Sequence, residues 1–180
     1  MFKNTSDWII IDTIDTQPFL EIVKKTIEDM SPISLDPVST RGENAKQYDL
    51  FDRLKNHIMI NEIKETISLN LKKHLGYKKN SLKLVSAWTV LGYKNTYHEL
   101  HKHNIKTKNH VSSVIYLKVP KSNKFSFYFI HQHNEEIFQE RLNPKEGNIF
   151  IFPVWLWHGV YPQSEEGLRQ TLNLDFEYEL

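Results

Sequence analysis

The chain has 180 residues, a length that suits one domain with a substantial core and is short for two. Hydrophobic residues make up 39% and aromatic residues 12%, which argues against intrinsic disorder. The 23 Lys and Arg residues nearly balance the 22 Asp and Glu residues, so binding of nucleic acid through a basic surface is disfavoured. The chain has no cysteine, which excludes disulfides and thiolate metal sites, so any metal must be held by His, Asp or Glu.

The first half of the chain is expected to be mainly helical. A short strand is predicted over residues 8–14. Apolar residues at helical spacing predict helices over residues 16–30 and 60–75, the second with Gly76 as its C-cap. The polar segment 31–56 contains Pro and Gly and is interpreted as a loop. No apolar run approaches the length of a membrane span, and the N-terminal stretch is too short for a signal peptide, so we expect a cytoplasmic protein without membrane contacts.

From residue 82 onward the apolar pattern changes to a period of two. This pattern predicts five strands, over residues 82–91, 111–119, 124–131, 148–152 and 169–178. Helices followed by such strands are typical of an α+β, mainly β fold, in which antiparallel strands close into a sandwich or jelly roll and the N-terminal helices pack on one sheet. We expect a single domain over residues 1–180, with a helical part in 1–80 and the barrel core in 81–180.

The last predicted strand has two contrasting faces. Its even-numbered positions are apolar: Leu172, Leu174, Phe176 and Tyr178. Its odd-numbered positions are polar: Arg169, Thr171, Asn173, Asp175 and Glu177. The apolar face is expected to pack on a core formed with the helices. The polar face is either exposed to solvent or the wall of a binding site.

Three histidines have the placement of metal ligands. His101 and His103 are two residues apart, so in an extended segment both imidazoles project to one face and reach the same ion. Glu99 shares that face, whereas His98 is expected to point away. His158 ends a very apolar strand, a position that suits a ligand directed into a pocket.

Other histidines and aromatics are given structural roles. His131 and His133 follow an aromatic strand, and they are interpreted as parts of an exposed loop. Trp155 and Trp157 flank the strand of His158 and are expected to pack in the core.

Arg169 follows His158 by eleven residues, and with it the set resembles the iron(II)- and 2-oxoglutarate-dependent oxygenases. Their motif is His-x-carboxylate, a later His, and an Arg about ten residues beyond it. The resemblance is strongest to small oxygenases, common in bacteria and phages, that carry His-x-His instead. The matching pieces are Trp88, Gly92-Tyr93, His101-Lys-His103, residues 111–117, residues 147–153, His158 and residues 169–173. Together they span about residues 85–176, over half of the chain.

The resemblance implies a double-stranded β-helix, a jelly-roll or cupin-like barrel, that binds Fe(II), 2-oxoglutarate and O2. It implies a hydroxylase that couples decarboxylation of 2-oxoglutarate to succinate with oxidation of a substrate, either a small molecule or a protein side chain. The implied metal ligands are His101, His103 and His158. The implied cosubstrate-binding residues are Arg169, Thr171, Asn173 and a phenol from Tyr116 or Tyr93. A phage-encoded enzyme in its host's cytoplasm is one source that the resemblance allows.

Position 103 departs from the usual motif, because His replaces the carboxylate ligand. Three interpretations are open. The ligands are three neutral His residues, or Glu99 contributes to the site, or His98 or His101 binds the metal together with a carboxylate from elsewhere and His103 lies behind the ligands. Two other functions are open as well. On the residues alone, one alternative is a cupin-like metalloenzyme that holds its metal with three His and does not use 2-oxoglutarate, and the other is a non-catalytic binding module.

Overall fold

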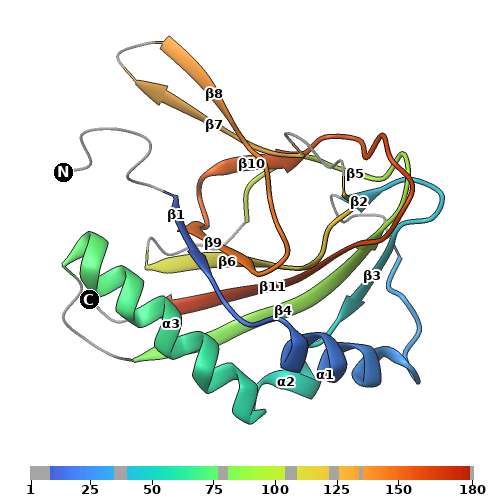
Figure 1. Ribbon diagram of the computed structural model, residues 1–180. Helices are drawn as coiled ribbons and strands as arrows, with labels where there is room; N and C mark the ends of the chain where they lie inside the picture. The colour runs from blue at the N-terminus through green and yellow to red at the C-terminus, as the bar shows by residue number, and fades with distance from the viewer. Residues whose placement is uncertain are drawn as a thin grey trace.

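The computed structural model describes residues 9–34, 40–76, 81–103, 109–121, 126–133 and 136–178. Two antiparallel sheets face each other, and helices cover the outer face of one of them (Figure 1). This arrangement confirms the expected mainly β fold with helices packed on one sheet. No helix in the described ranges is long and apolar enough to cross a membrane.

The larger sheet has six strands in the order β1-β9-β6-β11-β4-β3. Its members are β1 (Ile10–Thr13), β3 (Lys46–Asp49), β4 (Leu82–Gly92), β6 (His110–Lys118), β9 (Asn148–Pro153) and β11 (Arg169–Tyr178). The long strand β11 lies in the middle and pairs with β4 on one side and β6 on the other. Its buried position explains the near-perfect alternation of the sequence, because each residue faces one of two different interiors.

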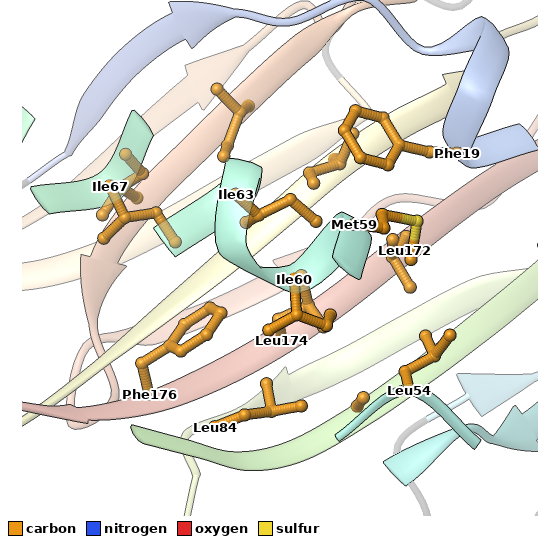
Figure 2. Packing of buried hydrophobic residues seen from close by; sticks show 14 of the residues in the cluster. Phe19, Leu54, Met59, Ile60, Ile63, Ile67, Leu84, Leu172, Leu174 and Phe176 are labelled. Atoms are coloured by element: carbon orange, nitrogen blue, oxygen red, sulfur yellow. The ribbon is translucent and has the colours of Figure 1, made fainter. Parts of the chain in front are cut away.

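Helices α1 (Gln17–Ile27) and α3 (Ile58–Leu75) lie on the outer face of this sheet. Figure 2 shows Ile60, Ile63 and Ile67 of α3 above the apolar residues of β11. Those residues, Leu172 and Leu174 among them, are fully buried, as the alternation predicts. Gly76 ends α3 in the left-handed conformation, with φ of 66°, and its N–H reaches the last carbonyls of the helix, which confirms the predicted C-cap.

The smaller sheet has five strands in the order β2-β5-β10-β7-β8. Its members are β2 (Thr40–Arg41), β5 (Tyr97–His101), β7 (Phe127–His133), β8 (Glu136–Leu142) and β10 (Trp157–Val160). Strands β7 and β8 form a hairpin that extends beyond the rest of the sheet (Figure 1). A second apolar cluster, which includes Phe127, Phe129 and Phe150, packs between the two sheets.

The loop interpretation of residues 31–56 is wrong, since this segment holds β2, β3 and the short helix α2 (Phe51–Leu54). Both strands are short edge strands, and they form because β4 and β5 offer unpaired backbone groups to them. Their own sequence is too polar and too short to show a period of two. Strands β5, β8 and β10 also have no clear alternation. β5 and β10 pair with a register shift, whereas β8 pairs regularly with β7 but is mostly exposed.

Strand β5 contains the irregularity that matters most for function. His158 on β10 pairs with His101, but Val160, two residues later, pairs with His98, three residues earlier. One extra residue on β5 therefore interrupts the alternation, as in a β-bulge. As a result His98 and His101 face the same side of the sheet although they are three residues apart.

Candidate metal centre

The structure brings His101, His103 and His158 together between the two sheets. One ring nitrogen from each lies within 4.8 Å of those of the other two. His101 and His158 are direct partners on neighbouring strands, and their ring centroids are 4.4 Å apart. His103 follows β5, where its backbone N–H donates to the carbonyl of Val154. The fold thus brings the His-x-His pair and the distant histidine close enough to bind a single ion.

The hydrogen bonds of His101 and His158 decide which nitrogen of each ring is free to bind a metal. The Nδ1 of His101 lies 2.7 Å from the Glu99 carbonyl oxygen, and that of His158 lies 2.8 Å from the Leu156 carbonyl oxygen. A carbonyl only accepts, so each Nδ1 carries a proton and donates. The Nε2 lone pair of each ring is then available to a metal. Metal-binding histidines usually donate from one ring nitrogen in this way and bind the metal through the other.

Burial keeps the imidazoles of His101 and His158 in the neutral form that binds metal. Desolvation lowers the pKa of His158 well below its ordinary value, and the neighbouring rings of His101 and His103 lower it further. Desolvation also lowers the pKa of His101, although its bond to the Glu99 carbonyl opposes that shift. Imidazole nitrogens that converge on one side of a cavity suit a divalent ion such as Fe(II).

The three histidines open into a cavity of about 190 Å³ that lies between the sheets. Besides them, its lining residues are Thr40, Gln47, Trp88, Val90, His98, Val114, Tyr116, Phe127, Val160, Arg169, Thr171 and Asn173. All four residues that the sequence assigns to a cosubstrate are in this set. Tyr93, the alternative phenol, is 38% exposed and is not in the cavity lining.

Arg169 places an unusual charge in this cavity. Its side chain is buried, and its Nη1 has no hydrogen-bond partner among the described residues. Nη2 makes a long bond of 3.4 Å to the Thr96 carbonyl, and none of the described carboxylates forms an ion pair with the guanidinium. Burial lowers the pKa of Arg169, but a guanidinium still stays charged. A buried cation in this state calls for an anion in the cavity.

Tyr116 adds a second unsatisfied donor. It lies on β6 beside Thr171 of β11, it is 1% exposed, and its hydroxyl has no partner among the described residues. Burial raises the pKa of the phenol, so it remains a neutral donor. Thr171 accepts a bond of 3.0 Å from Asn173 Nδ2, which leaves the threonine hydroxyl proton free to donate. The polar face of β11 is therefore the wall of a cavity and not a solvent face.

Glu99 is directed elsewhere. Its carboxylate pairs with Arg41 at 2.9 Å and is about half exposed. The bulge in β5 turns His98 into the cavity instead, so the expectation that His98 points away is wrong. His98 Nε2 lies 3.0 Å from Thr40 Oγ1, and burial followed by the charge of Arg169 lowers its pKa well below the ordinary value.

Two other expectations about side chains are also wrong. His131 lies in β7 and is 7% exposed, because its ring stacks on Phe138 of β8 and contacts Glu140 at 3.3 Å. The pairing of β7 with β8 places it in a hairpin rather than a loop. Trp155 lies in the turn before β10 and is 40% exposed. Trp157 is 44% exposed, since the alternation that turns His158 inward turns its neighbour outward.

Asp175, a carboxylate behind the histidines, was not identified as a functional residue from the sequence. Asp175 Oδ1 accepts a bond of 2.9 Å from His103 Nδ1, and Ser86 Oγ donates to its other oxygen at 2.9 Å. Asp175 lies in the polar row of β11, so the alternation contained its signal. Thr40 and Gln47, which also line the cavity, gave no signal because they lie in the segment interpreted as a loop.

The sequence matches the family described as "Putative 2OG-Fe(II) oxygenase" over residues 86–175, half of the 180-residue chain. This range contains all three histidines, Arg169 and Tyr116. No curated protein sequence matches this chain.

Solved structures of low sequence identity share the fold. A prolyl-4-hydroxylase from Pseudomonas putida has 12% identity and a TM-score of 0.62, over 96% of this chain and 93% of that chain. A 2-oxoglutarate complex of a viral collagen prolyl hydroxylase from Paramecium Bursaria Chlorella virus-1 has 13% identity and a TM-score of 0.61, over 95% and 97%. HygX from Streptomyces hygroscopicus, with nickel, 2-oxoglutarate and hygromycin B bound, has 12% identity and a TM-score of 0.63, over 94% and 82%. These likenesses confirm the double-stranded β-helix.

Proposed function

This chain belongs to the 2-oxoglutarate- and iron(II)-dependent oxygenases, and from that premise we propose that His101, His103 and His158 bind the iron. Their ring nitrogens lie within 4.8 Å of one another, and backbone or carboxylate acceptors hold the opposite nitrogens. Three ligands on one face of an octahedron leave other positions open for small molecules. Of the three interpretations of position 103, the set of three His ligands accounts best for these contacts.

The enzyme is an oxidoreductase that uses Fe(II), 2-oxoglutarate and O2. Iron, when bound, would supply the centre at which 2-oxoglutarate and O2 give succinate and CO2. One atom of O2 enters succinate and the other oxidises the substrate, which in a hydroxylase converts C–H to C–OH. The protein side chains supply the neutral nitrogen ligands, hold the cosubstrate in one orientation and exclude water from the cavity.

We propose that Arg169 and Tyr116 bind the carboxylate of 2-oxoglutarate that is distant from the metal. A guanidinium binds a carboxylate through two parallel hydrogen bonds, and a buried phenol adds a third donor. Thr171 contributes its hydroxyl, and Asn173 orients that hydroxyl from the same face of β11. These roles account for every unsatisfied donor that the described part of the cavity contains.

One observation carries this proposal: a buried, unpaired guanidinium shares a cavity of about 190 Å³ with three convergent imidazoles. A metalloenzyme with three His that does not use an oxo acid would leave the charge of Arg169 without a counter-ion among the described residues. A non-catalytic module would explain neither group. The size of the cavity suits the cosubstrate, because pockets for larger ligands begin at about 300 Å³.

The proposal is tested by Arg169→Ala. With Fe(II) and O2, we expect formation of succinate from 2-oxoglutarate to fall about 100-fold, and the dissociation constant for 2-oxoglutarate to rise by a similar factor, because a buried charged partner is lost. Succinate is measured directly, without added substrate, so that slow uncoupled turnover reports on the cosubstrate alone.

Arg53→Ala is the matched control, since Arg53 is an exposed guanidinium on α2 that pairs with Asp29 far from the cavity. We expect it to leave succinate formation unchanged. Unchanged affinity for 2-oxoglutarate in folded Arg169→Ala protein would contradict the proposed clamp.

We also propose that residues 1–180 act as one domain, with the N-terminal part joined to the 81–180 core. The pairing of β1 with β9 and of β3 with β4 supports this, because strands of the first 80 residues complete the larger sheet. A cytoplasmic enzyme that acts on a small molecule or a protein side chain remains the proposed setting, and the near balance of 23 basic and 22 acidic residues favours neither substrate.

A further inference from the structure

The proposed ligand set leaves the iron with no negative charge from the protein. The usual facial triad of such enzymes has two His and one carboxylate. Here three neutral imidazoles would surround a doubly charged ion, and the guanidinium of Arg169 adds a further positive charge to the same cavity. A buried site with so much positive charge requires compensation from nearby groups.

Asp175 is placed to provide it. The residue lies on the central strand β11, and its side chain is 5% exposed. Its Oδ1 accepts from His103 Nδ1 at 2.9 Å, on the side of the ring opposite to Nε2. Its Oδ2 accepts from Ser86 Oγ at 2.9 Å, so both oxygens are fixed. Ser86 is also the direct partner of Asp175 on the neighbouring strand β4.

The three histidines differ in what holds them. His101 and His158 donate from Nδ1 to backbone carbonyls, whereas His103 alone donates to a carboxylate. Position 103 is also the position at which the usual motif has its carboxylate ligand. The carboxylate of Asp175 therefore lies behind His103, the residue that stands where the usual motif has its carboxylate ligand.

We propose that Asp175 supplies the missing charge of the metal centre through the imidazole of His103, and that Ser86 positions it. A carboxylate that accepts from Nδ1–H makes Nε2 a more basic ligand and fixes the ring orientation. Asp175 is thus a positioning residue that acts through His103. The inference rests on the proposed ligand set and adds to it a residue outside the metal's direct contacts.

The test measures metal affinity of the full-length protein, without turnover. Metal-free protein is titrated anaerobically with Fe(II), and with Co(II) as a spectroscopic probe. In Asp175→Asn the amide oxygen can still accept from His103 and the amide N–H can donate to Ser86, so the shape is kept while the charge is lost. We expect the dissociation constant for either metal to rise about 10- to 100-fold. We also expect the absorption bands of bound Co(II) to shift.

Two further variants grade the effect. Ser86→Ala keeps the charge but frees one carboxylate oxygen, and we expect a smaller loss of affinity than for Asp175→Asn. Asp12→Asn is the control. Asp12 lies on β1, outside the cavity lining, and its carboxylate accepts a hydrogen bond of 2.7 Å from Asn70. Its variant is expected to bind metal as the wild type does.

A purely structural role for Asp175 gives a different result. In that case Asp175→Asn and Ser86→Ala would lower the melting temperature of the metal-free protein but leave the metal dissociation constant and the Co(II) bands unchanged, which would overturn the inference. Failure of the ligand set itself is recognised separately, because His158→Ala would then bind metal like the wild type. Tight binding by Asp175→Asn together with lost binding by His158→Ala rejects the role of Asp175 alone.

Discussion

The two sheets contribute to the cavity in different ways. The larger sheet provides Arg169, Thr171 and Tyr116 from long strands whose pairing is regular over most of their length. The smaller sheet provides His101 and His158 from strands of five and four residues, joined across a bulge. The proposed anion-binding wall is part of the same sheet that carries the main hydrophobic core, whereas the proposed metal ligands His101 and His158 lie on strands that pack little apolar surface.

This difference indicates that the two halves of the site depend on different physical interactions. The proposed clamp is held by burial of the opposite face of β11 against the helices. The proposed metal ligands are held by individual hydrogen bonds to their Nδ1 atoms. Substitutions of the histidines on the smaller sheet should therefore weaken metal binding with little change in stability. Substitutions in the core of the larger sheet should lower stability with little change in metal binding.

The largest effect is expected for His158→Ala on the smaller sheet. Loss of one of three ligands should abolish stoichiometric binding of Fe(II) or Co(II), a larger effect than the 10- to 100-fold that partners behind the ligands contribute. Anaerobic titration measures it. His74→Ala, at the exposed end of α3, serves as the control, and equal binding by the two variants would show that the ligand set is wrong.

The second effect concerns the core of the larger sheet. Leu174→Ala removes a fully buried side chain beneath α3, and we expect a loss of about 2–5 kcal/mol in the free energy of unfolding. Denaturant unfolding of the metal-free protein measures it. Because Leu174 faces away from the cavity, the folded variant should keep its metal dissociation constant. A loss of metal affinity comparable to that of His158→Ala would remove the distinction between the sheets.

Tyr116→Phe tests the clamp with the smallest change in shape. Removal of one hydroxyl should raise the dissociation constant for 2-oxoglutarate about tenfold, as expected for one hydrogen bond to a charged group. Metal affinity in the absence of 2-oxoglutarate should not change. Tyr93→Phe, on an exposed tyrosine, is the matched control, and an effect there instead of at Tyr116 would move the phenol donor to the other residue.

The smallest effect is that of pH on the metal-free protein. The pKa of His98 is lowered by burial and then by the charge of Arg169. The unfolded chain therefore binds a proton near pH 6.5 that the folded chain does not, and stability falls as pH decreases below that value. From pH 7 to 5.5 each such histidine contributes about 1 kcal/mol of this loss.

His98→Gln should reduce that loss of stability, as measured by denaturant unfolding at the two pH values. His57→Gln is a control from the other side of the molecule, where His57 caps α3 and accepts from the Met59 N–H. An unchanged pH dependence in His98→Gln would show that this ring does not stay neutral in the fold.

Regular elements of the larger sheet could be predicted from the sequence, and irregular ones could not. The alternation of residues 169–178 predicted β11 with the same bounds and assigned its apolar face to the core, but it left the polar face open between solvent and a binding site. The helix α3 and its C-cap at Gly76 were predicted within two residues. Each of these elements buries a face along its whole length, so its periodicity is complete.

The structure brings together the residues predicted for the candidate site, but their surroundings were not predicted. Spacing suggested His101 and His103 as a pair, because this pattern is local in sequence. The role expected for Arg169 came from the resemblance to the oxygenase motif. The bulge in β5 has no sequence signal of its own, so His98 was placed on the wrong face. Thr40 and Gln47 reach the cavity only through edge pairing, which depends on the tertiary fold.

Strand β11 carries Arg169 and Thr171 of the proposed clamp on one face and core residues on the other, so we expect activity to depend on the correct register of this strand. A shift of its register by one residue would exchange the two faces, placing Leu172 and Leu174 in the cavity and Arg169 beneath the helices. Such a misfolded species would lose its core as well as its ability to bind 2-oxoglutarate. Chains that fold in this way should be removed by aggregation or proteolysis, and they should not persist as stable, inactive protein.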